Sequence, residues 1–140
     1  MKKYTIYILI LLIVSCARDT SIDLGDGYRF DHDVLRYRDY TIYGPYQNTL
    51  AVSPHVLGYD FDSTFIIALQ KPREVILGDA YLYPNLTLDE TEKIFRESQL
   101  RHYWIIDKKA RIKYGPLSGE EFFIKRKELK VSEELVLERR

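Results

Sequence analysis

The N-terminus limits the fold most, because the first residues form a segment that we do not expect in the folded protein. Lys2 and Lys3 give this segment a positive start, and an almost wholly apolar run follows from Tyr4 to Val14. The run has the length of the apolar region of a secretory signal and is short for a helix that must cross the ~30 Å hydrocarbon core of a bilayer. The sequence therefore predicts that residues 1–15 are an export signal.

The only cysteine of the chain, Cys16, stands directly after this run. Residues 13–16 resemble the lipobox of bacterial lipoproteins, in which a branched apolar residue and two small or apolar residues precede the cysteine that receives diacylglyceryl. A thiolate is the nucleophile that takes the lipid, and two or three acyl chains, such as palmitate, anchor a protein stably. The resemblance implies lipidation of Cys16; the alternative is a buried cysteine of an ordinary secreted protein.

This interpretation divides the chain into three parts and changes the composition of the mature protein. We expect a signal peptide over 1–15, the lipidated cysteine and a polar tether over 16–24, and a single domain over 25–140. Of 21 Lys and Arg residues, 21 − 2 = 19 remain against 21 Asp and Glu, so the mature formal charge is 19 − 21 = −2. A nucleic-acid partner would require a basic patch, so none is expected. With Cys16 lipidated, disulfide bonds, thiolate nucleophiles and Cys-ligated zinc are excluded.

The clearest strand signals lie in the middle of the chain. Residues 55–70 predict a hairpin, and the continuous apolar run Phe65–Leu69 predicts a strand at the centre of a sheet, because such runs are covered on both faces. Residues 71–86 fit either a strand or a loop. The remaining strand-like segments are 28–30 after a glycine turn at 24–28, 34–43 with an irregularity near Asp39, and the pair 103–106 and 111–114, which ends at Gly115-Pro116.

Two capping boxes predict two helices. Thr87 with Glu90, and Ser118 with Glu121, have the spacing at which each side chain satisfies a free backbone amide at a helix start. The expected helices run over about 88–99 and 119–130. The fold class is therefore α+β, a small, mostly antiparallel β-sheet with two helices packed on it. Side chains expected on the apolar faces of the helices are Leu88, Thr91, Ile94, Phe95 and Ser98 in the first and Phe122, Phe123 and Leu129 in the second.

A family resemblance covers most of the mature chain. The hairpin that begins at Tyr103-Trp104-Ile105-Ile106, followed by Tyr114-Gly115-Pro116-Leu117-Ser118 and the helix at Glu120-Glu121-Phe122, resembles a family of short uncharacterised bacterial lipoproteins found chiefly in Bacteroidota. The segments Leu24–Tyr28 and Phe65–Ala68 fit it too. The shared motifs are structural, and the family has no assigned activity, so the resemblance implies no catalytic residue and no cofactor.

Histidines and paired aspartates are the only candidates for metal or acid–base chemistry. His32 lies between Asp31 and Asp33, Asp60 and Asp62 are two residues apart, and His55 and His102 stand alone. Each aspartate pair places only two oxygens on one face of a strand, which is too few for a metal site without distant ligands. The favoured interpretation is that these aspartates stabilise tight turns. No nucleophile elbow or dinucleotide-binding loop is present.

These exclusions favour a membrane-tethered, non-catalytic binding or structural module of the cell envelope, with an envelope protein or a glycan as partner. Its binding surface would use exposed tyrosines, because a tyrosine ring offers both area and a hydrogen bond. One alternative is an inhibitor or immunity-type protein with an acidic helix face, and a weaker one is a hydrolase that uses His32 or His55. The tyrosines considered are Tyr37, Tyr40, Tyr43, Tyr46, Tyr81 and Tyr83, and the acidic residues are Asp89, Glu90, Glu92, Glu97, Glu120, Glu121 and Glu128.

The residues after Cys16 bear on localisation. Ala17 is not the aspartate that resembles an inner-membrane retention signal, so the outer membrane is favoured. Residues 17–20 also lack the acidic run associated with surface export in Bacteroidota lipoproteins, which favours the periplasmic face.

Overall fold

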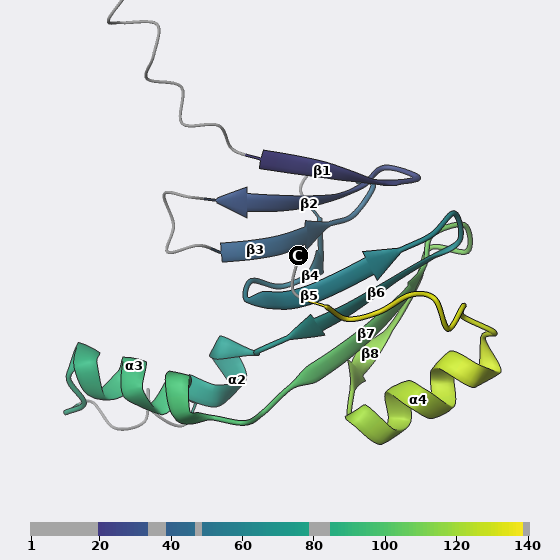
Figure 1. Ribbon diagram of the computed structural model, residues 1–140. Coiled ribbons are helices and arrows are strands. Elements are labelled where there is room, and N and C mark those ends of the chain that lie inside the picture. Colours follow the sequence, from purple (N-terminus) through teal and green to yellow (C-terminus); the bar gives the residue numbers. More distant parts are fainter. Residues whose placement is uncertain (1–19, 34–38, 47–48, 79–84, 139–140) are drawn as a thin grey trace, which may run out of the picture.

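The computed structural model describes residues 20–33, 39–46, 49–78 and 85–138, which form two four-stranded antiparallel sheets and three helices (Figure 1). The predicted α+β class is confirmed. The expectation of one sheet is wrong, because the strands of the N-terminal half form a sheet of their own that packs on the sheet of the C-terminal half. The predicted export signal and Cys16 lie outside the described residues.

The first sheet is a meander in which each strand pairs with the next. Its strands are β1 (Thr20–Gly25), β2 (Tyr28–Asp33), β3 (Asp39–Tyr43) and β4 (Leu50–Val52). The predicted glycine turn joins β1 to β2, where Gly25 and Gly27 have φ angles of 87° and 83°, values that glycine adopts without strain.

One sequence expectation for this sheet needs correction. The tether was expected to reach residue 24, but β1 begins at Thr20, because an edge strand needs only backbone pairing with β2 and little apolar alternation. Of the strand expected over 34–43, residues 39–43 form β3, in which Asp39 pairs with Asp33 of β2. Residues 34–38 lie outside the described residues.

The second sheet contains β5 (Val56–Phe61), β6 (Phe65–Gln70), β7 (His102–Asp107) and β8 (Ile112–Leu117), in that order. The predicted hairpin over 55–70 and the central position of Phe65–Leu69 are confirmed, since β6 pairs with both β5 and β7. Gly115-Pro116 was expected to end its strand. Instead, both residues lie within β8, and the peptide bond between them is cis. Proline is tolerated there because β8 is an edge strand.

Both faces of the second sheet are covered, because successive side chains along its strands belong alternately to two hydrophobic cores. In β6, Ile66 and Ala68 face the first sheet, whereas Ile67 between them faces the opposite side. Trp104 and Ile106 of β7 likewise join the core between the sheets, and Ile105 joins the other core. The core between the sheets also contains Leu24, Tyr28, Phe30, Ile42, Ala51, Val52, Val56 and Tyr59, and the second core contains Phe122, Val131 and Leu135.

Three helices lie outside the sheets. The short α2 (Arg73–Gly78) occupies part of the segment that fitted either a strand or a loop. The helices α3 (Leu88–Glu97) and α4 (Gly119–Glu128) confirm the two predicted helices, and both capping boxes are present, although both helices end earlier than predicted. Figure 1 places α2 and α3 at one end of the second sheet, whereas α4 lies beneath that sheet, where Phe122 packs against Ile67 and Ile105. No helix among the described residues is long and apolar enough to cross a membrane.

The C-terminal segment after α4 returns across the second sheet (Figure 1). Val131 and Leu135 are buried in the core beneath it, and the backbone amide of Val136 donates a hydrogen bond to the buried Asp60 carboxylate of β5 over 3.0 Å. Gly58 allows this close approach, since a Cβ there would lie 3.0 Å from the Leu137 carbonyl oxygen. These contacts hold the segment on the second sheet.

A buried lysine joins the two sheets. Lys108, in the turn after β7, is 3% exposed, and its Nζ donates a hydrogen bond to the Leu24 carbonyl oxygen at the end of β1 over 2.6 Å. Its ammonium also lies 5.6 Å from the centre of the Phe61 ring. The long lysine chain thus satisfies a backbone group of the first sheet from the second.

Candidate functional site

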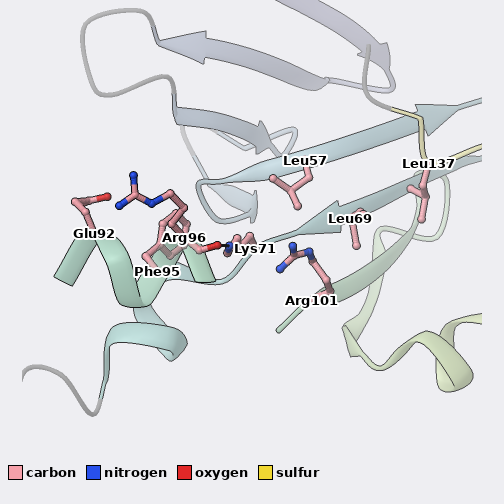
Figure 2. Close-up of a pocket in the computed structure, with 8 residues that line it drawn as sticks. All are labelled: Leu57, Leu69, Lys71, Glu92, Phe95, Arg96, Arg101 and Leu137. Atoms are coloured by element: carbon pink, nitrogen blue, oxygen red, sulfur yellow. Dashed lines mark hydrogen bonds between the residues drawn. The ribbon is translucent and has the colours of Figure 1, made fainter. Parts of the chain in front are cut away.

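A hollow of about 570 Å³ opens between the second sheet and α3 (Figure 2). We call it the cationic hollow. Its apolar wall consists of Leu57 of β5, Leu69 of β6, Leu137 of the C-terminal segment and the Phe95 ring of α3. Its charged side chains are Lys71, Glu92, Arg96 and Arg101. Three cations against one carboxylate give the lining a formal charge of 3 − 1 = +2.

Lys71 is the most buried of these cations. It follows directly after β6, is 8% exposed, and donates a hydrogen bond from Nζ to the Arg96 carbonyl oxygen of α3 over 2.9 Å. Its ammonium lies 4.9 Å from the centre of the Phe95 ring. Burial, and to a lesser degree the positive charge of Arg101, lowers the pKa of Lys71 below its ordinary 10.5. Keeping Lys71 protonated at this position therefore costs free energy.

Arg101 and Arg96 complete the positive lining. Arg101 precedes β7 and donates from one guanidinium nitrogen to the Ser98 and Leu100 carbonyl oxygens, over 3.2 and 2.8 Å. In Figure 2 its guanidinium lies beside Lys71, whereas Arg96 extends from α3 towards the outer rim. Within the described part of the chain, Lys71, Arg96 and Arg101 form no salt bridge. Among the described residues, no carboxylate forms an ion pair with any of these three cations.

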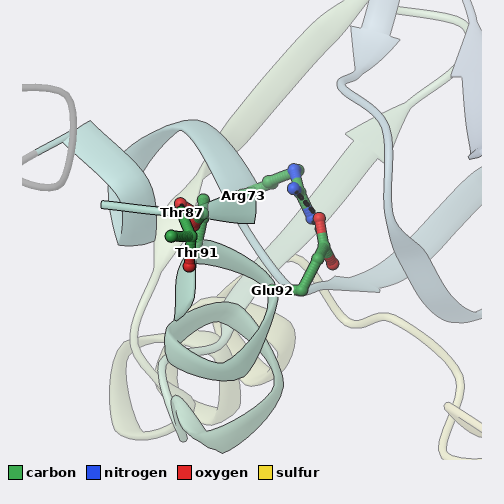
Figure 3. Close-up of polar contacts among 4 residues, drawn as sticks. All are labelled: Arg73, Thr87, Thr91 and Glu92. Atoms are coloured by element: carbon green, nitrogen blue, oxygen red, sulfur yellow. Dashed lines mark hydrogen bonds and ion pairs between the residues drawn. The ribbon is translucent and has the colours of Figure 1, made fainter. Parts of the chain in front are cut away.

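The one carboxylate of the hollow is already engaged. Glu92 forms an ion pair with Arg73 of α2 (Figure 3), and this hydrogen-bonded contact lowers the pKa of Glu92. Nearby, the Thr91 hydroxyl donates to the Thr87 carbonyl oxygen over 2.9 Å, and Thr87 caps the start of α3. The contacts in Figure 3 therefore hold α3 in place and leave Glu92 unable to neutralise Lys71 or Arg101.

Phe95, like Glu92, is a side chain by which α3 contacts the rest of the fold. Its ring meets the His55 ring edge-on at 5.0 Å, and the Arg73 guanidinium lies 4.8 Å from its centre. With Lys71, these contacts surround Phe95 by one imidazole and two cations. Cation–π contacts of this kind are worth about 0.5–1 kcal/mol at exposed sites and more when water is excluded.

A second hollow, of about 430 Å³, has Pro72 and Arg73 among its lining residues. We call it the histidine hollow, because both His55 and His102 line it, together with Trp104 and Gln70. Gln70 is held by the protein itself: its Nε2 donates to the Ser53 and Pro54 carbonyl oxygens, and its Oε1 accepts from the Trp104 indole nitrogen over 2.9 Å. Burial lowers the pKa of His102, which favours its neutral form.

The sequence of both hollows falls within a known protein family. Residues 31–139 match the family described as Protein of unknown function (DUF3997). The chain belongs to the DUF3997 family. No curated protein and no solved structure matches it. The match to the DUF3997 family begins within β2 and contains every lining residue of both hollows.

The structure of this DUF3997 protein places the aspartates singled out in the sequence. Asp62 confirms the turn interpretation, since it accepts hydrogen bonds from the Thr64 and Phe65 amides, each over 2.7 Å. Asp60 is a correction, because it is buried in β5 and holds the C-terminal segment. Asp31 also lies in a strand, where it accepts from the Ser21 hydroxyl over 2.6 Å and pairs with Arg29. In the described residues no three His, Asp or Glu side chains lie close enough to hold one metal ion.

The histidines separate into two groups. His32 stacks on Tyr40 of the first sheet at 4.4 Å, and its Nε2 is buried without a hydrogen-bond partner among the described residues. His55 and His102 lie together at the histidine hollow, 47 positions apart in the sequence but at matching ends of β5 and β7. The hydrolase hypothesis paired His32 or His55 with a carboxylate; Glu74 is the carboxylate that shares the histidine hollow with His55.

The three described tyrosines among the six considered lie away from the two hollows. Tyr40 is half-buried in a stack with Phe30 and His32, Tyr43 lies under the Arg29 guanidinium at 4.5 Å, and Tyr46 is 61% exposed beside Arg111. None of them lines the cationic or the histidine hollow. Tyr37, Tyr81 and Tyr83 lie outside the described residues.

Most of the acidic residues on the helices have partners within the chain. Glu90 and Glu121 accept from the Thr87 and Ser118 amides in the capping boxes, and these hydrogen bonds lower the pKa of both carboxyls. Glu92 pairs with Arg73, and Glu128 pairs with Lys125. The cationic side chains Lys71, Arg96 and Arg101 were not singled out in the sequence. A signal that could have found two of them is a basic residue directly beside an apolar strand, since Lys71 follows β6 and Arg101 precedes β7.

Proposed function

We propose that this protein is a membrane-anchored lipoprotein of the bacterial cell envelope, of the kind found chiefly in Bacteroidota, and that its domain is a non-catalytic binding module. The lipid on Cys16 would attach it to the membrane, with the outer membrane and its periplasmic face favoured. The cationic hollow is the binding site in this proposal. The observation that supports it is a concave site of small-molecule size that holds uncompensated positive charge beside an apolar wall.

The short connection between Cys16 and the fold supports the anchoring part of the proposal. Only residues 17–19 separate Cys16 from β1, which begins at Thr20. Four peptide steps span at most about 14 Å, at roughly 3.5 Å per residue. A lipid on Cys16 would therefore hold β1 close to the membrane surface and raise the effective concentration of the hollow for ligands there.

The binding module is favoured over the inhibitor alternative because the cationic hollow holds unpaired charges, whereas most of the acidic helix residues have partners. An acidic helix face would need free carboxylates, and four of the seven residues considered are engaged in caps or ion pairs. The unpaired charges at the hollow are positive. A partner that recognises them carries negative charge.

Lipid labelling tests the anchor. Cells that express the full chain would be fed an alkyne analogue of palmitate, and the protein would be isolated and its mass measured. We expect label on the wild type and none after Cys16→Ser, with membrane flotation lost in parallel. Ser21→Ala, a nearby change that keeps the cysteine, serves as the control and should keep both. Label that persists in the Cys16→Ser variant would contradict the anchor.

Photo-crosslinking in the same cells tests the binding site. A photoreactive phenylalanine replaces Leu137, which lines the cationic hollow, or Lys109, which is exposed in the turn after β7. The proposal expects a defined adduct in the intact mass from position 137 and none from position 109. Equal adducts at both positions, or none at either, would contradict a binding module that uses this hollow.

A further inference from the structure

The cationic hollow combines two kinds of lining in one small volume, and each kind lies on its own side. Lys71 and Arg101 carry positive charge beside α3, and three leucines form an apolar wall towards the C-terminal segment (Figure 2). We propose that the hollow binds an anionic amphiphile, with a carboxylate or phosphate against Lys71 and Arg101 and a hydrocarbon part on Leu57, Leu69 and Leu137. This inference rests on the binding function proposed above and names its ligand class.

The unused hydrogen-bonding capacity of Lys71 argues for an anion. A lysine ammonium has three donors, and Lys71 uses one on the Arg96 carbonyl oxygen. The described residues give it no carboxylate partner, although it is nearly buried and Arg101 repels it. Burial of an unpaired charge is costly, so such charges are normally paired. An incoming anion would supply the missing acceptor and offset the repulsion at once.

The apolar wall is built by an irregularity in β5. The register of β5 against β6 runs from Val56 opposite Gln70 to Gly58 opposite Leu69, so Leu57 is an extra residue in the ladder. Val56 is buried between the two sheets, whereas Leu57 lines the hollow beside Leu69. A bulge of this kind turns a side chain to a different face, and bulges are frequent next to binding sites. Here it adds a leucine to the wall that a hydrocarbon would contact.

The shape of the hollow favours a small molecule over a protein. Its volume of about 570 Å³ lies within the range of small-molecule sites. Lys71 is 8% exposed, so a flat protein surface would not reach its ammonium, whereas a single carboxylate or phosphate group would. Free fatty acids and the phosphate-bearing ends of lipids share this chemistry, and the experiment distinguishes them.

The test is a calorimetric titration of the chain from residue 17, which keeps both hydrophobic cores, since their residues lie between Leu24 and Leu135. The probes are decanoate, decyl phosphate, decanol and inorganic phosphate, all below micelle-forming concentrations. We expect decanoate or decyl phosphate to bind at one site, and the better of the two identifies the anion. Decanol, which lacks the charge, and inorganic phosphate, which lacks the chain, should each bind at least about tenfold more weakly.

Variants locate the binding site. Arg101→Gln and Lys71→Met should each weaken the better anionic probe about tenfold or more, because each removes a charge-assisted hydrogen bond. Lys109→Gln removes one positive charge from an exposed turn and should leave binding unchanged. Thermal unfolding of every variant is measured in parallel. If Lys71→Met does not fold, the test depends on Arg101→Gln, because the Arg101 side chain is only half-buried.

Several outcomes would overturn the inference. Equal binding of decanol would show that charge is not recognised, and equal binding of inorganic phosphate would show that the leucines are not used. Binding that survives Arg101→Gln unchanged would place the probe elsewhere. If none of the probes binds while position 137 still forms its adduct in cells, the ligand class is wrong and the binding module stands; if that adduct is absent as well, both fail.

Discussion

Helices α3 and α4 begin in the same way and end up in different surroundings. Each has ten residues and a complete capping box, with Thr87 and Glu90 in one and Ser118 and Glu121 in the other. In α4, Phe122 is 1% exposed and belongs to the core on the second sheet. In α3 no residue is buried, and Leu88 is 86% exposed. Local sequence determines that both segments are helical, and it does not determine how firmly either is held.

The difference has a consequence for the proposed site. α4 is held by apolar packing, whereas α3 is held by the half-buried Phe95 ring, the Arg73–Glu92 ion pair and the bond from Lys71 to the Arg96 carbonyl oxygen. Side chains of α3 form one wall of the cationic hollow, so that wall is the less firmly held part of the molecule. Segments with few buried apolar contacts open at lower free energy than the core.

Phe122→Ala should lower the stability of the whole domain by about 3–5 kcal/mol, because it removes a fully buried aromatic ring from a packed core. Urea unfolding followed by circular dichroism measures this loss. Phe123→Ala on the same helix is the control and should have little effect, since Phe123 is 61% exposed. Equal losses in the two variants would contradict the role of Phe122 as the anchor of α4.

Phe95→Ala should cost less, about 1–2 kcal/mol, because the ring is only half-buried and its contacts are with His55 and cationic groups. Its effect should be local. Amide hydrogen exchange should become faster in α3 and stay unchanged in α4. If exchange accelerates equally in both helices, α3 is part of the same cooperative unit as the core.

The two caps offer a matched comparison. Ser118→Ala should lower global stability by about 1 kcal/mol, the usual cost of losing an N-cap side chain. Thr87→Ala removes the same kind of hydrogen bond from α3, and it should speed exchange in that helix while the midpoint of urea unfolding barely moves. A midpoint that moves equally in both variants would mean that the helices are equally coupled to the fold.

Arg73→Gln should have a smaller effect, below about 1 kcal/mol, since Glu92 is more than half exposed and surface ion pairs contribute little. Binding of the anionic probe offers a second measurement. Without its partner, Glu92 would place a free negative charge at the rim, so we expect weaker binding, and Glu92→Gln should restore it in the double variant.

Acid should weaken both caps within the same pH window. The pKa values of Glu90 and Glu121 are lowered by the amides they accept from, so their stabilising effect is complete above the unfolded-state value of about 4.5 and is lost as pH falls below it through the folded-state values. Glu121→Gln should therefore lower the melting temperature at pH 7 and make little difference near pH 2. A constant difference between pH 7 and pH 2 would rule out this linkage.

Sequence reasoning located the elements whose signals are local. The hairpin over 55–70, the central strand and both capping boxes depend on neighbouring residues, and the structure confirms them. The division into two sheets was missed because alternation shows that a strand has two faces, and it does not show which strands share a sheet. Phe123 was expected to face the sheet, but it is exposed, since α4 offers only Phe122 to the core.

The candidate site was missed for a related reason. Lys71 and Arg101 are 30 positions apart, and they meet only because β6 and β7 are antiparallel neighbours, so that the end of one strand lies beside the start of the other. Leu57 reaches the hollow through a bulge that no sequence pattern announced. Sites built from strand ends depend on register, which a single sequence does not reveal.

The bond from Lys108 to the Leu24 carbonyl oxygen joins residues 84 positions apart. A ribosome or an export channel delivers the chain from its N-terminus, so the first four strands emerge long before the lysine that ties them to the second sheet. During that interval the Leu24 carbonyl oxygen lacks its hydrogen bond from Lys108, and the apolar face of the first sheet has no cover. The order of delivery therefore keeps the first sheet without its partner sheet until most of the chain has arrived.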